Sequence, residues 1–374
     1  MTALVYLSPV AWSSFAQRPH KFAEWFHASG GAKVLWVEPY PTRLPLWSDL
    51  YRLRRRQREP AQNVPPWMEI ARVGALPLEP LPGSGLINGR LWSRALQRIT
   101  AFASAQPCEL VIGKPSKLAL RVLASAQFTR STYDAMDDFP AFYRGFSRRA
   151  MARTEQQVAA RVSAVQVSAT RLVAKFARPG AEVALVRNAC SPETLAPVDS
   201  LPALRDHARI GYVGTLGSWF DWGLVLALAR SNPDMQVRLT GPLLVPPPTS
   251  LPANVQLRPA CSHVDAMREM ASFAVGLIPF LRNELTASVD PIKYYEYRAL
   301  GVPVLSSAFG EMLEHARGGG VTLLDGQADL RRVVLDALAQ RDDAAAIIEF
   351  RERNMWSSRF ACSPLSLPAS TAVR

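Results

Sequence analysis

The sequence predicts an α/β protein built from two Rossmann-like, doubly wound domains that face a cleft. Three observations support this: strand and helix patterns alternate along 374 residues, a proline-rich break interrupts them near the middle, and the alternation then restarts. The length suits two domains of ordinary size, and 48% apolar residues can fill two cores. We expect domains at 1–190 and 207–345, followed by a C-terminal helix and tail, 346–374, that would return to the first domain.

Each half is predicted as buried strands joined by amphipathic helices, a pattern typical of a mainly parallel sheet covered on both faces. Between the halves, residues 188–206 hold three prolines and little periodicity, which indicates a linker. The first half has expected strands at 3–8, 33–37, 68–73, 109–112, 131–136, 165–168 and 183–186, and helices at 19–28, 86–102, 116–124 and 141–162. The second half opens with a strand running into a glycine turn, 208–219, then a helix at 222–230 and strands at 236–240 and 272–280. A helix, the strand 302–306, another helix, the strand 321–324 and terminal helices complete it.

The net charge of +12 lies in the first half. Residues 1–200 hold 26 Lys and Arg against 14 Asp and Glu, a difference of +12, whereas residues 201–374 hold 17 of each. This asymmetry predicts an anionic partner, such as a lipid surface, a lipid-linked pyrophosphate or nucleic acid. The sequence contains no apolar run of about 18 residues that would predict a spanning helix, and its start reads as a strand instead of a signal peptide. Four scattered cysteines indicate reduced thiols in the cytosol and show no metal-binding spacing.

The strongest functional signal is the stretch DPIKYYEYRALGVPVL, residues 290–305. Lys293 and Glu296 lie three residues apart near an expected helix start, so they share one helix face beside free N–H groups and the positive dipole end. There the ammonium could contact a diphosphate while the carboxylate accepts from ribose hydroxyls, although a solvated ion pair is the ordinary alternative. The run resembles the donor signature P-x-K-x-x-E-x-x-A-x-G-x-P-V of GT-B glycosyltransferases, which is matched by Pro291, Lys293, Glu296, Ala299, Gly301, Pro303 and Val304.

The resemblance covers most of the chain and implies further donor contacts. The stretch IGYVGTLGSW is similar to the start of the family's nucleotide domain, which implies that Gly214 and Thr215 let the backbone approach the donor phosphates. Retaining members often carry a Glu eight positions before the ribose Glu, but this chain has Ser288 there, so the stereochemical outcome stays open. Ser288 and Asp290 are still expected to line the donor site. The resemblance implies no metal and no resident cofactor, with a UDP- or GDP-linked sugar as substrate.

Adjacent acids at the end of a first-half strand are the candidate catalytic groups. In YDAMDDFPAFYRGF, residues 133–146, either Asp137 or Asp138 could act as the general base that deprotonates an acceptor hydroxyl. The segment loosely resembles the YRASDG segment of the xanthan-pathway glucuronosyltransferase, in which the Asp is the base, and the match falls on Asp137. A base at Asp137 would imply inversion of the anomeric centre. The structural alternative is an ordinary helix N-cap.

Basic side chains of the first half are candidates for acceptor and membrane contacts. Arg18 and His20 follow the first strand and could contact an acceptor or donor phosphate, or simply begin a solvated helix. Residues 46–60, LWSDLYRLRRRQREP, form either a basic amphipathic helix that suits an anionic membrane surface or an exposed basic loop. The membrane contacts would come from Trp47, Arg52, Arg54, Arg55 and Arg56.

Together these features predict a cytoplasmic glycosyltransferase that is peripheral on the inner face of the cell membrane. The stretch RPHKFAEWFHASGGAKVLWVEP, residues 18–39, resembles the opening helix and strand of bacterial GT-B members that elongate surface polysaccharides, and this resemblance implies a role in surface polysaccharide synthesis. Its partners would be a nucleotide sugar, a lipid-linked or saccharide acceptor, and an anionic membrane surface. Nucleic acid is not expected, because no recognition motif accompanies the basic patches. Two alternatives stay open: a nucleotide-sugar epimerase-like GT-B enzyme, and a basic non-enzymatic scaffold that binds nucleic acid or membrane. The sequence does not specify the donor sugar, the acceptor, the linkage or the oligomeric state.

Overall fold

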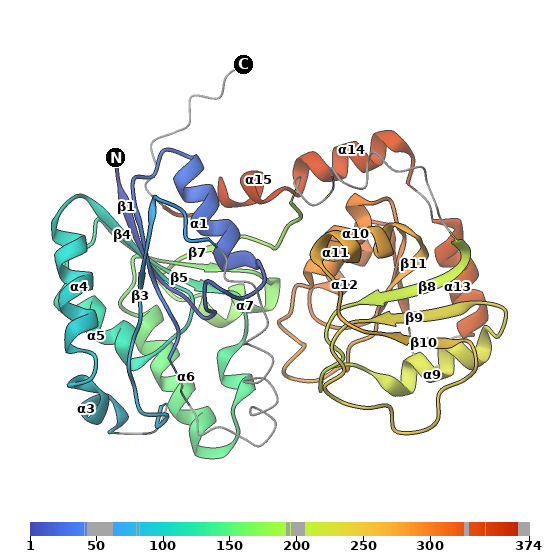
Figure 1. The fold of residues 1–374 in the computed structure, drawn as a ribbon, viewed down its shortest axis with the longest axis horizontal. Helices are drawn as coiled ribbons and strands as arrows, with labels where there is room; N and C mark the ends of the chain where they lie inside the picture. Colours follow the sequence, from blue (N-terminus) through green and yellow to red (C-terminus); the bar gives the residue numbers. More distant parts are fainter. Residues whose placement is uncertain are drawn as a thin grey trace. The chain divides into compact units, whose positions relative to one another are not determined.

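The chain folds into two compact α/β units (Figure 1). The computed structural model describes residues 1–40, 42, 63–79, 81, 83–191, 195, 206–324, 329–340 and 342–365. The first unit contains Met1–Ser168, Leu172–Val186 and the described residues from Cys362 onward, and the second contains Ala169–Arg171 and Arg187–Ala361. Most of the predicted linker, 188–206, lies outside the described residues.

A parallel sheet of seven strands, in the order β3-β2-β1-β4-β5-β6-β7, forms the middle of the first unit. Every residue of β1 is buried, as expected for a parallel strand covered on both faces, and Figure 1 shows α4 and α5 on one side of the sheet and α1 on the other. The strands are β1 (Ala3–Leu7), β2 (Val34–Val37), β3 (Met68–Ala71), β4 (Cys108–Ile112), β5 (Arg130–Ala135), β6 (Ala164–Val167) and β7 (Glu182–Leu185). The helices are α1 (Arg18–Ala28), α3 (Ser84–Gly89), α4 (Ser93–Ser104), α5 (Lys117–Ser125), the 3-10 helix η1 (Phe139–Phe142), α6 (Gly145–Ala159) and α7 (Thr170–Phe176), which starts in residues assigned to the second unit.

A six-stranded parallel sheet, in the order β10-β9-β8-β11-β12-β13, forms the second unit. In both sheets the strand order reverses beside the first strand, between β1 and β4 and between β8 and β11, and open α/β sheets bind ligands at the carboxyl ends of such neighbours. The strands are β8 (Asp206–Val213), β9 (Gln236–Thr240), β10 (Val255–Arg258), β11 (Phe273–Ile278), β12 (Val304–Ser307) and β13 (Val321–Leu324). The helices are α9 (Trp222–Ser231), α10 (His263–Ala271), α11 (Ile292–Ala299), α12 (Met312–Arg317), α13 (Leu330–Ala339), α14 (Ala344–Arg353) and α15 (Trp356–Phe360).

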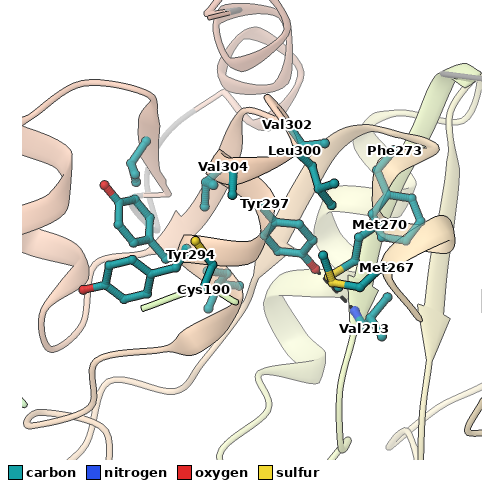
Figure 2. Packing of buried hydrophobic residues seen from close by; sticks show 14 of the residues in the cluster. Cys190, Val213, Met267, Met270, Phe273, Tyr294, Tyr297, Leu300, Val302 and Val304 are labelled. Atoms are coloured by element: carbon teal, nitrogen blue, oxygen red, sulfur yellow. Dashed lines mark hydrogen bonds between the residues drawn. The ribbon is translucent and has the colours of Figure 1, made fainter. Parts of the chain in front are cut away.

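Two apolar clusters fill the second unit, and each involves a different set of helices. Residues of α9 and α13 contribute to one cluster, and residues of α10, α11 and α12 contribute to the other. Figure 2 shows part of the second cluster, in which Tyr297 lies beside Met267, Met270 and Phe273. A Cβ atom at position 276 would lie only 2.5 Å from the Cγ of Tyr297, so Gly276 allows the α11 ring to rest directly on β11.

The predicted α/β class and the two parallel sheets are confirmed. The strands predicted at 236–240 and 321–324 have the observed bounds. The single helix predicted at 86–102 is wrong, because a turn at residues 90–92 separates α3 from α4. The long helix predicted from 141 is likewise split into η1 and α6. Three elements, α7, β10 and α10, were not predicted.

Candidate functional site

The predicted donor helix is α11, and its first turn is open. Pro291 occupies the N-cap and no side chain caps the helix. Among the described residues, no group accepts a hydrogen bond from the backbone N–H groups of Ile292 and Lys293. An uncapped helix start with a lysine in its first turn presents donors and positive charge to an anion.

Lys293 and Glu296 form an ion pair on this helix. The Lys293 Nζ atom lies 2.6 Å from Oε2 of Glu296, and the Glu296 side chain is only 7% exposed whereas that of Lys293 is 24% exposed. The predicted shared helix face is therefore present, with the ammonium toward solvent and the carboxylate inside. A pair at this depth is less screened than a surface pair.

Tyr297 connects α11 to the strand that leads to the predicted phosphate turn. Its hydroxyl accepts a hydrogen bond from Val213 N at 3.3 Å and donates to Gly211 O at 3.3 Å, and Figure 2 shows the contact with Val213. Val213 is the last residue of β8 and is followed by Gly214. The lysine–glutamate helix and the glycine turn are thus held together by a buried side chain that the sequence analysis did not select.

Gly214 and Thr215 form a tightly packed turn after β8. A Cβ atom at Gly214 would lie 2.7 Å from the Tyr212 hydroxyl, and a Cβ atom at Gly241 would lie 2.0 Å from the Gly214 carbonyl oxygen. The Tyr212 hydroxyl also donates to the Thr215 carbonyl at 3.1 Å. Two neighbouring turns therefore pass with their backbones in contact, which requires glycine and keeps the turn free of side-chain bulk.

Asp290 is the centre of a buried hydrogen-bond network in the second unit. Its carboxylate accepts from Asn188 N at 2.7 Å and from the Tyr295 hydroxyl at 2.9 Å, and it contacts His315 Nε2 at 2.9 Å. The His315 ring also stacks on Tyr294, with ring centroids 3.8 Å apart. Because these protein groups already occupy the carboxylate, Asp290 fixes the start of α11 instead of presenting a free acceptor to a ligand. Ser288, which was also expected to line the donor site, is buried, with 1% of its surface exposed.

A hollow of about 520 Å³ lies at the carboxyl ends of β11 and β12 in the second unit. Its volume is within the range of small-ligand sites. Gly310 shapes this hollow with a φ of 45°, and a Cβ atom there would lie 2.6 Å from two backbone carbonyl oxygens. Gly214, Lys293 and Glu296 do not line it. The lining residues are Thr170, Arg171, Arg282, Asn283, Glu284, Thr286, Ala287, Ala308, Phe309, Gly310, Glu311, Leu313 and Glu314.

Asp137 lies two residues beyond β5, at the carboxyl edge of the first sheet. Its side chain is half-buried and has no hydrogen-bond partner among the described residues. The pKa of its carboxyl is raised to about 7, mainly by burial; Arg18 opposes this rise, and the nearby Asp138 and Asp134 add to it. A carboxylate with a pKa near neutrality and a free oxygen has the properties of a general base.

Asp138 has a different environment. It occupies the N-cap of η1, but its side chain makes no capping hydrogen bond, so the predicted cap interaction is absent. Its carboxylate instead pairs with Lys175 Nζ at 2.6 Å, and the same ammonium lies 2.5 Å from Glu155. Of the two adjacent acids, only Asp137 has an unoccupied carboxylate.

Arg18 and His20 are buried, and their polar atoms are used inside the first unit. Arg18 is 2% exposed and its guanidinium contacts Asp134 at 2.9 Å and donates to Val186 O at 2.8 Å. His20 accepts from Gln17 N at its Nδ1 atom, which makes its Nε2 atom the donor to Trp12 O at 3.1 Å. Burial lowers the pKa of His20, which favours this neutral form. The predicted phosphate contacts of both residues do not fit this geometry, which gives them structural roles.

Sequence reasoning also missed a polar cluster at the carboxyl ends of β1, β2 and β4. Glu79 is 2% exposed and accepts from the Tyr40 hydroxyl at 2.6 Å. Lys114 donates to Thr42 Oγ1 at 3.2 Å, and burial lowers the pKa of its ammonium. A cavity of about 20 Å³ lies beside Lys114, which is room for about one water molecule. No spacing in the sequence signals this cluster, because its members come from three separate segments.

Some predicted contacts cannot be placed. Trp47, Arg52, Arg54, Arg55 and Arg56 lie outside the described residues. In the parts of the chain that the structure covers, no helix is both long and apolar enough to span a membrane. The same parts contain no group of three or more His, Cys, Asp or Glu side chains arranged to hold a metal ion.

Comparison with known proteins identifies the fold. No protein-family model matches the chain, and no curated protein matches it in sequence. Among solved structures it is similar to sucrose-phosphate synthase from Thermosynechococcus elongatus, with a TM-score of 0.67, 13% identity and 96% of each chain covered. It is also similar to HepE from Anabaena in complex with UDP and glucose, with a TM-score of 0.61, 12% identity, and 96% and 97% of the two chains covered. An alpha-glucosyltransferase in complex with UDP and DNA gives a TM-score of 0.55 at 9% identity, with 96% and 95% covered. The chain therefore has the GT-B fold of two Rossmann-like domains.

Proposed function

We propose that this protein is a nucleotide-sugar-dependent glycosyltransferase. The observation that carries the proposal is the paired Lys293 and Glu296 at the open start of α11, a helix hydrogen-bonded to the strand that ends before Gly214. The HepE and alpha-glucosyltransferase structures of similar fold were solved with UDP, and one HepE structure was solved with UDP-glucose. A UDP- or GDP-linked sugar is accordingly the donor class that we assign to the second unit.

In this proposal the donor diphosphate binds Lys293 and the N–H groups of the first turn of α11. The ribose hydroxyls donate to Glu296, which is released from its pair with Lys293 when the ammonium turns to the diphosphate. A charge-assisted hydrogen bond of this kind contributes about 1.5–3 kcal/mol. The backbone at Gly214 would approach the phosphates, where no side chain intrudes.

The first unit supplies the base in our scheme. Asp137 accepts the proton of an acceptor hydroxyl, the hydroxyl oxygen forms a bond to the anomeric carbon, and the bond from that carbon to the diphosphate breaks. The electron pair of the broken bond leaves with the diphosphate, whose charge Lys293 stabilises. A single displacement of this kind inverts the anomeric centre. Retaining members often carry a glutamate at the position of Ser288, and this single displacement needs no carboxylate there.

We propose a lipid-linked or polysaccharide acceptor of surface polysaccharide synthesis, and a peripheral position on the inner face of the cell membrane. The support is the charge asymmetry, because all of the net charge of +12 belongs to residues 1–200. A basic acceptor half favours an anionic lipid surface or a pyrophosphate-bearing acceptor.

Thermal-shift measurements with a panel of nucleotides and nucleotide sugars test the donor assignment. We expect UDP or GDP to raise the melting temperature, and Lys293→Ala and Glu296→Ala each to remove most of that gain. Lys21 and Glu24 provide a matched control, because they form another i, i+3 pair at 2.9 Å on α1 in the first unit. Lys21→Ala and Glu24→Ala should keep the full nucleotide response. Wild-type nucleotide affinity in both α11 variants would make the donor assignment wrong.

A further inference from the structure

Helix α3 has its polar and apolar faces reversed relative to an ordinary surface helix. The inward residues are Ser84 and Asn88, and the Asn88 side chain accepts from Leu76 N at 2.8 Å and donates to Leu76 O at 3.1 Å. The outward residues are apolar: Leu86 is 78% exposed and Ile87 is 55% exposed. Polar anchors therefore hold this helix in place while its apolar side chains face solvent.

The apolar side chains of α3 continue into the turn that follows. Leu91, in the turn at residues 90–92, is 49% exposed, and Arg90 beside it in the chain is exposed as well. We name the surface formed by Leu86, Ile87, Arg90, Leu91 and Arg94 the α3 edge.

The α3 edge is basic as well as apolar. Residues 83–104 contain three arginines and no acid. Arg90 and Arg94 are exposed and have no ion-pair partner among the described residues. Of the acids nearby in sequence, Glu79 is buried and Glu69 pairs with Arg98 at 3.1 Å. The surface thus carries uncompensated positive charge around exposed aliphatic groups.

A second segment that combines exposed apolar side chains with arginines begins at η1. Phe142 is 56% exposed and Phe146 is 81% exposed, and residues 139–154 contain four arginines and no acid. This segment follows β5 and leads away from Asp137 at the carboxyl edge of the sheet. The α3 edge lies near the same sheet edge, because a Cβ atom at Gly85 would be 3.4 Å from Lys117 at the start of α5, just beyond β4.

We propose that the α3 edge, together with Phe142 and Phe146, docks the first unit onto the surface of an anionic lipid bilayer. Leucine, isoleucine and phenylalanine would enter the boundary between headgroups and acyl chains, and the arginines would contact lipid phosphates. The inference rests on the proposed function, because the reason for docking at this edge is to bring Asp137 close to a lipid-linked acceptor. The surface is distinct from the predicted cluster at residues 52–56.

The chemistry of the surface favours a bilayer over nucleic acid. Nucleic acid binds through arginine and stacked aromatic rings, and it gains little from exposed aliphatic side chains such as Leu86 and Ile87. A bilayer uses both groups, because its interior removes the aliphatic carbons from water while its headgroups supply the negative charge.

Vesicle flotation tests the proposal with the full chain. The probes are phosphatidylcholine vesicles with and without phosphatidylglycerol, each at low and high salt. We expect the wild-type protein to bind only the anionic vesicles. Leu86→Ser/Ile87→Ser should weaken this binding about tenfold or more at both salt concentrations, because it removes apolar burial. Arg90→Gln/Arg94→Gln should weaken it about tenfold at low salt and hardly at high salt.

Leu335→Ser/Ile348→Ser is the matched control, because it replaces a leucine 48% exposed and an isoleucine 56% exposed in the second unit. It should bind vesicles like the wild type. Equal binding by the Leu86/Ile87 and control variants would overturn the proposal, as would loss of binding only in Arg54→Ser/Arg55→Ser/Arg56→Ser. Binding to single-stranded DNA, measured by fluorescence anisotropy, completes the experiment. α3-edge substitutions that weaken DNA binding but leave vesicle binding unchanged would also overturn the proposal.

Melting curves and the nucleotide response on the same proteins separate this proposal from the proposed function. An α3-edge variant that keeps its melting temperature and its nucleotide shift but loses vesicle binding supports both. Vesicle binding that depends on the α3 edge, in a protein that no nucleotide stabilises, supports the docking surface and contradicts the donor assignment. If Leu86→Ser/Ile87→Ser unfolds, the salt-dependent loss expected of Arg90→Gln/Arg94→Gln decides the matter.

Discussion

Replacing Asp137 with asparagine should stabilise the folded protein above neutral pH and at the same time lower its turnover. Burial raises the pKa of this carboxyl from 3.8 to about 7, so the folded protein binds this proton more tightly than the unfolded chain does. The stabilising contribution of the protonated form is complete below pH 3.8 and is lost as the pH rises through about 7. An asparagine does not titrate and does not suffer this loss.

The size of the stability effect follows from the same pKa. A change from 3.8 to about 7 corresponds to at most about 4 kcal/mol at about 1.4 kcal/mol for each tenfold change. Because the side chain is only half-buried, solvent reduces the expected gain to about 1–3 kcal/mol. Asp137→Asn should therefore unfold at higher urea concentration than the wild type at pH 8, and at nearly the same concentration near pH 4.

Turnover should change in the other direction. A base with a pKa of about 7 is about one-tenth ionised at pH 6, so wild-type turnover should rise about tenfold from pH 6 to a plateau above pH 8. Asp137→Asn should lower turnover by about 10²–10⁴-fold and remove this rise, while nucleotide affinity stays nearly unchanged. Release of nucleotide from the donor found by thermal shift, with a membrane lipid extract as acceptor, provides the assay.

Asp138→Asn is the control for this experiment. It removes a half-buried pair with Lys175, so it should cost about 0–1 kcal/mol. Because Asp138 raises the pKa of Asp137, its loss should also move the turnover profile toward lower pH. An active but destabilised Asp137→Asn protein would refute the reasoning and leave Asp137 a structural role. Loss of turnover in Asp138→Asn alone would move the base to Asp138.

Two further substitutions test the internal scaffold. Arg18→Met should destabilise the first unit by about 3–5 kcal/mol, because it leaves the buried Asp134 carboxylate without its ion-pair partner, and Arg18→Met/Asp134→Asn should recover much of that loss in urea unfolding. Tyr297→Phe should cost about 1–3 kcal/mol, because Val213 N loses its acceptor, and it should weaken UDP or GDP binding in the thermal-shift assay. A Tyr297→Phe protein with unchanged stability and nucleotide response would mean that the hydroxyl does not hold α11 in place.

The architecture was predictable because its signals are local. Buried strands such as β1 appear as short apolar runs, and their regular alternation with helices specifies a parallel α/β sheet. The edge strand β10 was missed because only Val255 of its four residues is buried, so it shows no apolar run. The start of α11 was predictable for the same local reason, since Pro291 stands at the beginning of the helix.

The environment of the site residues was not predictable, because it depends on partners far away in the sequence. Arg18 looked exposed and available, but Asp134 lies 116 residues away and holds it in the core. Asp290 looked like a ligand contact, yet Asn188, 102 residues before it, uses its carboxylate. A single sequence contains no pattern that indicates such long-range contacts. The sequence analysis could therefore select candidate residues but could not predict which of them are already bound by other protein groups.

The closed pair of Lys293 and Glu296 has a consequence for selectivity among small anions. Inorganic phosphate or pyrophosphate would have to take the ammonium from Glu296 and would leave a carboxylate that is 7% exposed without a donor. A free nucleoside would cause the opposite loss. Its hydroxyls would bind the Glu296 carboxylate, and the Lys293 ammonium would be left without an anion. In the proposed donor site, only a molecule that carries diphosphate and ribose together would satisfy both groups at once. Because phosphate and nucleosides each satisfy only one group of the pair, they would bind weakly and compete poorly with a sugar nucleotide.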